Sequence, residues 1–129
     1  MRVTFLALAA GALVFVSGAA LADDPMSNTY ANTVHTTNKA NGAQGTLMFN
    51  ANNSYTANAT DPKGQPVSYT GSWMLKDDGK TICLTPNIPN ANPPPPTTCS
   101  PLEKHNVGET WTVTNNMNET YDVSLTAGR

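Results

Sequence analysis

The stretch VSYTGSWMLKDDGKTICL, residues 67–84, decides the fold. From Val67 to Leu75, apolar or small residues occupy every second position, which is typical of a β-strand with one buried face. KDDGK (76–80) then supplies an Asp-Gly turn before TICLT (81–85). Because Asp-Gly between two alternating segments favours a tight reversal of the chain, these residues predict a β-hairpin.

Other parts of the chain repeat this pattern. Residues 111–114 and 121–126 alternate on either side of the turn NNMNE, and residues 44–50 and 54–60 form another pair; TYANTVHTT (29–37) is a further candidate strand. Outside the N-terminal leader, no segment shows a sustained helical period of apolar residues. The sequence therefore predicts an all-β fold, an antiparallel meander of seven or eight strands arranged as a small barrel or a sandwich.

Residues 1–22 have the layout of a secretory signal peptide. Arg2 precedes an apolar run, and Ala20 and Ala22 form an A-x-A cleavage site before Asp23. A membrane-spanning helix is the alternative, but the run is rich in Ala and Gly and ends at a cleavage consensus. We expect a mature single domain over residues 23–129 in the bacterial periplasm or the medium, with no membrane span after cleavage.

The charge of the mature chain excludes some partners. Six of the seven Lys and Arg residues lie in the mature part, all except Arg2, together with all nine Asp and Glu residues. Scattered lysines in a weakly acidic chain provide no basic surface for nucleic acid or for an anionic membrane.

Both cysteines, Cys83 and Cys99, lie in the mature part. Export to an oxidising compartment predicts that they form one disulfide. The bridge closes a loop over residues 86–99 in which Pro93–Pro96 favour polyproline II. On the entropic model, closing a loop of this size stabilises the fold by about 3 kcal/mol.

Motifs for enzymatic chemistry are missing from the sequence. There is no G-x-S-x-G, H-E-x-x-H, P-loop or C-x-x-C, and Asp77 and Asp78 are explained by the turn. The residues His35, Cys99, His105 and Met117 have the ligand types of a blue-copper site. Their spacing is too wide for that site and Cys83 competes for Cys99, so we expect no metal, no cofactor and no catalytic residues.

The aromatic residues admit two interpretations. The core of a small barrel must be filled from its inward face, and nearly all the bulk available for this comes from Trp73, Trp111, Phe49, Tyr55 and Tyr121. Large aliphatic residues are few, however, so an aromatic-lined cavity open at one end is the other interpretation, with ligand-binding candidates Tyr69, Trp73, Leu75, Trp111 and Tyr121.

The pattern N-x-x-Y-T-A, G-x-W, D-G-K-T-x-C-L-T-P and V-G-x-T-W-T-V resembles small exported alphaproteobacterial β-proteins without an assigned function, and the resemblance covers most of the mature chain. G-x-W followed by a hairpin is also loosely similar to lipocalin-type barrels. Trp73 lies midway along the chain, whereas the lipocalin tryptophan belongs to the first strand. The second resemblance implies a barrel whose interior holds a ligand.

Three hypotheses for function follow. The first is an exported, non-catalytic domain that binds a small apolar or aromatic ligand or a partner in the cell envelope. The second is a structural or stress-related envelope protein without a ligand, and the third is a periplasmic enzyme or copper-binding protein.

Overall fold

The computed structural model describes residues 24–61 and 63–129, so the predicted signal peptide lies outside the described residues. The described part of the chain is all-β, as predicted, and contains eight antiparallel strands and no helix. The strands are β1 (Asn32–Asn38), β2 (Gln44–Phe49), β3 (Ser54–Thr60), β4 (Pro66–Lys76), β5 (Thr81–Asn87), β6 (Thr98–Pro101), β7 (Thr110–Thr114) and β8 (Thr120–Ala127).

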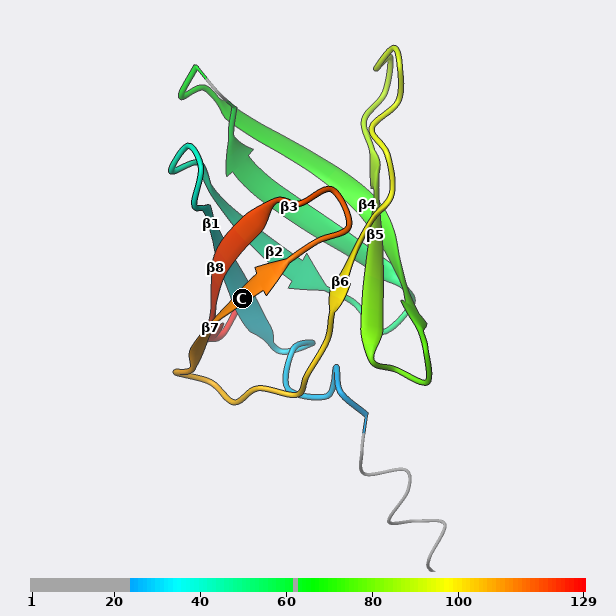
Figure 1. Cartoon of the computed structure of the whole chain (residues 1–129), viewed down its shortest axis with the longest axis vertical. Helices are drawn as coiled ribbons and strands as arrows, with labels where there is room; N and C mark the ends of the chain where they lie inside the picture. Colours follow the sequence, from blue (N-terminus) through cyan, green and yellow to red (C-terminus); the bar gives the residue numbers. More distant parts are fainter. Residues whose placement is uncertain (1–23, 62) are drawn as a thin grey trace, which may run out of the picture.

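The strands form one sheet in the order β6-β5-β4-β3-β2-β1-β8-β7. Each strand pairs with its neighbour in sequence, except that β6 and β7 do not pair and β1 pairs with β8, with Val34 opposite Leu125. The sheet curls into a nearly closed barrel (Figure 1). Its one seam lies between β6 and β7.

The predicted hairpin is confirmed as β4 and β5, with Trp73 opposite Leu84. Asp77, Asp78 and Gly79 in the turn all have positive φ, at 56°, 58° and 84°. Asp and Gly tolerate this backbone region better than other residues. The Thr81 hydroxyl also donates to the Asp77 carboxylate at 2.9 Å, which ties the turn to β5.

Some strand boundaries differ from the predictions. Residues 25–31 form turns, and β1 begins only at Asn32 because Met26 is drawn into the core and the chain turns to place it there. The eighth strand, β6, was not located from the sequence, and β5 and β6 shorten the predicted loop 86–99 to residues 88–97. Val67 has the predicted phase but is 39% exposed, because it lies at the beginning of β4, next to the β3–β4 connection.

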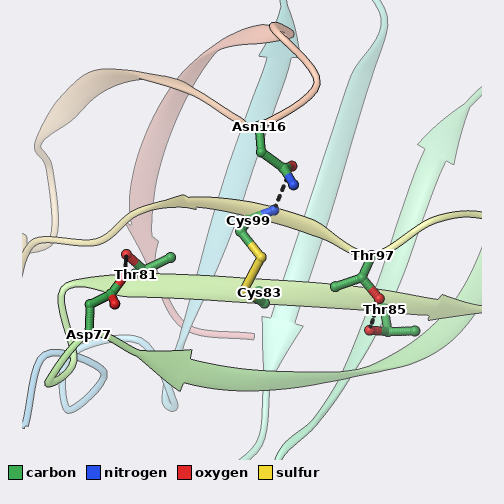
Figure 2. The surroundings of a disulfide bond; sticks show 7 residues. All are labelled: Asp77, Thr81, Cys83, Thr85, Thr97, Cys99 and Asn116. Carbon is green, nitrogen blue, oxygen red and sulfur yellow. Dashed lines mark hydrogen bonds between the residues drawn. A yellow bond between two sulfur atoms is a disulfide. The ribbon is translucent and has the colours of Figure 1, made fainter.

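The predicted disulfide is present, and it joins β5 to β6 at directly opposed positions, Cys83 and Cys99. Next to it, Asn116 in the turn between β7 and β8 bridges the seam. The Asn116 backbone N–H donates to the Cys99 carbonyl at 2.9 Å, and the Cys99 N–H donates to the Asn116 side-chain oxygen at 3.0 Å (Figure 2). Two hydrogen bonds therefore close the barrel where strand pairing stops.

The two ends of the barrel differ. The core gathers at the end where the N-terminal turns cross beneath β1, and its buried members are Met26, Val34, Phe49, Tyr55, Ala57, Trp73, Val123 and Leu125. The opposite end carries the β1–β2, β3–β4 and β7–β8 connections and the long loop 88–97 (Figure 1). We call these the closed end and the open end.

Candidate binding cavity

A cavity of about 530 Å³ occupies the interior of the barrel. This volume lies within the range of roughly 300–1,000 Å³ that is typical of small-molecule sites. Inward-facing side chains from all eight strands line it, together with residues of loop 88–97 at the open end and Met26 at the closed end. The barrel is therefore not completely filled by its own side chains.

Small residues on β2 and β3 explain why space remains. Gly45, Ala57 and Ala59 all line the cavity, and Gly45 lies directly opposite Ala59 in the sheet. Ala57 pairs with Leu47 on β2 and with Tyr69 on β4. Side chains normally fill the interior of an eight-stranded barrel. Here the wall formed by these three residues has little side-chain volume to contribute.

Trp73 helps to seal the closed end and does not line the cavity. The indole is only 6% exposed, and its Nε1–H donates to the carbonyls of Asn50 and Ser54 at 3.0 and 3.1 Å. Its ring meets Phe49 edge-on, with the ring centroids 6.3 Å apart. Trp73 is thus a core residue whose polar atom is paired with backbone.

The N-terminal turns complete the seal. Met26 is 1% exposed and forms the floor of the cavity. The Asp24 carboxylate accepts a hydrogen bond from the Met26 N–H at 2.9 Å, and the Asn28 amide donates to the His105 carbonyl at 2.9 Å. These contacts tie the turns to the loop that precedes β7.

Three tyrosines face the cavity: Tyr55, Tyr69 and Tyr121. The ring of Tyr55 lies over Gly71, where any Cβ would overlap it, and meets Tyr69 edge-on at 6.5 Å. Burial raises the pKa of all three phenols; the Tyr69 phenol raises the pKa of Tyr55 further, and the Glu119 carboxylate raises that of Tyr121, against a smaller lowering by a hydrogen bond with Asn38. The hydroxyl groups therefore remain protonated at neutral pH.

His105 stacks on Trp111 at the closed end of the cavity. The ring centroids are 3.7 Å apart and the planes differ by 6°. Nδ1 of His105 lies 3.0 Å from a Glu109 carboxylate oxygen. A hydrogen bond from the Asn106 backbone N–H, and another from His105, lower the pKa of Glu109, so this carboxylate stays ionised and holds the imidazole in place.

The charged side chains that line the cavity are acidic. Glu103 and Glu119 contribute carboxylates, and neither Lys nor Arg is among the lining residues in the described chain. The carboxylate of Glu119 accepts a hydrogen bond from the Asn115 amide at 2.9 Å, while Asn115, 8% exposed, accepts from the backbone N–H groups of residues 117 and 119. Glu103 lies 4.0 Å from His105.

The structure separates the five candidate ligand-binding residues into two groups. Tyr69, Trp111 and Tyr121 line the cavity, whereas Trp73 and Leu75 pack in or against the core and do not. Sequence reasoning left Tyr55, Gly45, Ala57 and Ala59 out of the candidate set. Their position in the period-two pattern of β2 and β3 was the signal that could have identified them.

The positions of the four residues with copper-ligand types do not support a copper site. His35 faces outward and pairs with the Thr126 hydroxyl at 2.9 Å, Cys99 is in the disulfide, and His105 and Met117 belong to opposite ends of the barrel. Among residues 24–61 and 63–129, no three His, Cys, Asp or Glu side chains form a group that could hold a metal ion. The same residues include no helix long and apolar enough to cross a membrane.

Comparison with known proteins gives no match to a family model, a curated protein or a solved structure.

Proposed function

We propose that this protein is a binding protein that holds a small, mainly apolar molecule inside its barrel. The observation that carries the proposal is the cavity of about 530 Å³, which is lined by aromatic, aliphatic and small side chains and by a few polar groups. Sites for small molecules combine these features. An eight-stranded meander closed by pairing of β1 with β8 supports a lipocalin-like mode of binding, with the ligand in the interior.

Export to the periplasm or the medium is part of this proposal. The Cys83–Cys99 disulfide is compatible with an oxidising compartment, where disulfides persist. Expression in a bacterial host followed by N-terminal sequencing tests this part. We expect the exported chain to begin at Asp23, and an exported chain that begins at Met1 would contradict cleavage at this site.

Binding can be tested with N-phenyl-1-naphthylamine, a neutral apolar probe whose fluorescence rises when it leaves water. We expect saturable binding to the wild-type protein at one site per chain. Ala59→Leu adds three carbon atoms to the cavity wall and should weaken binding at least tenfold. Thr70→Leu places an apolar side chain on the exposed outer face of β4 and serves as the matched control.

The control variant should bind the probe as the wild type does. Near-ultraviolet circular dichroism of both variants establishes that the barrel is folded. If folded wild-type protein shows no saturable binding, or if Ala59→Leu and Thr70→Leu bind equally well, the ligand does not occupy the interior and the proposal is wrong.

A further inference from the structure

The cavity contains hydrogen-bond donors without protein partners. Tyr55 is 1% exposed, and its hydroxyl has no hydrogen bond to any group in the described part of the chain; the same holds for the hydroxyl of Tyr69. Buried polar groups are paired in the large majority of cases, because an unpaired one loses its hydration without compensation. The fully buried Tyr55 phenol therefore needs a partner that the protein itself does not supply, and the partly buried Tyr69 phenol beside it is also unpaired.

These donors are placed to act together. The rings of Tyr55 and Tyr69 meet edge-on with centroids 6.5 Å apart, and both line the cavity. Tyr121 stands on β8, four strands away from β4 in the eight-stranded sheet, and so faces Tyr69 from the opposite wall. A protonated phenol can donate one hydrogen bond, so a group between these walls would find donors rather than a base.

The charged side chains that line the cavity determine which ligand charge it can accept. An anionic head group would be buried without a Lys or Arg partner and close to the carboxylates of Glu103 and Glu119. Burying an unpaired charge is strongly unfavourable. Both carboxylates belong to exposed side chains, and that of Glu103 is 83% exposed, so neither provides a buried counter-ion for a cationic ligand.

We propose that the ligand is a neutral, largely apolar molecule carrying a carbonyl-type oxygen that accepts hydrogen bonds from the Tyr55 and Tyr69 hydroxyl groups. This inference rests on the proposed function and specifies the ligand of the same cavity. It distinguishes ketones, aldehydes, esters and quinones from fatty acids and from plain hydrocarbons.

Three naphthalenes of similar size test the inference: 2-acetylnaphthalene, 2-ethylnaphthalene and 2-naphthoate. Each is used to displace N-phenyl-1-naphthylamine at pH 7.5. A net hydrogen bond of about 0.5–1.5 kcal/mol corresponds to roughly a two- to twelvefold gain for the ketone over the hydrocarbon. We expect 2-naphthoate to bind weakest, at least tenfold below 2-ethylnaphthalene.

Variants test whether the preference for the ketone depends on the hydroxyl groups of Tyr55 and Tyr69. Tyr69→Phe and Tyr55→Phe should each reduce the advantage of the ketone while leaving the affinity for 2-ethylnaphthalene within about twofold. Tyr30→Phe is the matched control, because Tyr30 contacts Trp73 and does not line the cavity. It should leave the order of the three ligands unchanged.

The outcomes separate this inference from the proposed function. If the probe and 2-ethylnaphthalene bind but the ketone has no advantage, or if 2-naphthoate binds more tightly than the ketone, this inference is wrong and the binding function stands. A ketone advantage that persists in both Tyr55→Phe and Tyr69→Phe also contradicts it. If no probe binds to folded wild-type protein, the proposed function and this inference fail together.

Discussion

Replacement of Trp73 by Ala tests whether this side chain belongs to the core at the closed end or lines the cavity. The ring is almost completely buried among Phe49, Tyr30 and the backbone of the β2–β3 turn, so its removal leaves a void in the core. Large-to-small changes of this kind destabilise proteins by about 3–5 kcal/mol.

The hydrogen bonds of the indole add little to this value. The Asn50 carbonyl also accepts from the Asn53 N–H at 3.2 Å, and the Ser54 carbonyl accepts from the Asn50 N–H at 2.9 Å. Both acceptors therefore keep a partner in the variant, and no buried carbonyl becomes unpaired. We expect a loss of about 3–5 kcal/mol that comes mainly from the void and the lost burial.

Equilibrium unfolding in urea, followed by far-ultraviolet circular dichroism, measures the loss. Trp73→Phe keeps an aromatic ring, and it supplies folded protein for probe titration if the Ala variant is too unstable; its probe affinity should stay within about twofold of wild type. Trp111→Ala is the contrasting variant, because Trp111 is half-buried and lines the cavity. It should lose less stability and more probe affinity.

A loss below about 2 kcal/mol for Trp73→Ala, or a large loss of probe affinity in folded Trp73→Phe, would refute the assignment of Trp73 to the core. Equal effects of the Trp73 and Trp111 changes on stability and on binding would refute the division of the barrel into a sealed end and a cavity.

Three further predictions follow from individual contacts. Gly71→Ala should destabilise the fold by about 1–3 kcal/mol in urea unfolding, because the new Cβ would overlap the Tyr55 ring and come within 2.6 Å of the Thr85 carbonyl; an unchanged midpoint would contradict the close approach. Replacing Cys83 and Cys99 by Ala should lower stability by about 3 kcal/mol, and a thermal midpoint equal to wild type would contradict a stabilising role for the bridge. The raised pKa values of Tyr55, Tyr69 and Tyr121 mean that the unfolded chain releases phenolic protons first as the pH passes the ordinary value of 10.0, so stability should be intact below that pH and fall above it; a urea midpoint that is the same at pH 9 and pH 11 would contradict this.

The hairpins could be predicted from the sequence because their signals are local. In β4 and β5, the alternation and the Asp-Gly turn lie within a few residues of the contacts that they specify. The start of β1 could not be predicted from the sequence, because it depends on Met26 reaching a core built by distant strands. The four residues of β6 are too few for a period to show, and Cys83 opposite Cys99 marks their pairing only once the disulfide is known.

The candidate site was predictable only in part. Tyr69, Trp111 and Tyr121 were found because large aromatic residues in the inward phase of a strand are conspicuous. The cavity itself depends on missing side-chain volume at Gly45, Ala57 and Ala59, and small residues in a strand also occur where nothing is bound. The stack of His105 on Trp111 joins a loop to a strand, and no sequence period encodes such a contact.

The pairing of β1 with β8 has a consequence for the order in which the molecule folds. Asn32 lies opposite Ala127, so this ladder joins residues at nearly opposite ends of the described chain. Long-range pairing of this kind forms slowly, because the entropy of closing the intervening loop is lost before the contacts are gained. We expect the hairpins of β2–β3 and β4–β5 to form early, with β8 docking on β1 as the late step that creates the interior. A nascent chain that lacks β8 would therefore have its hairpins but no barrel in which to hold a ligand.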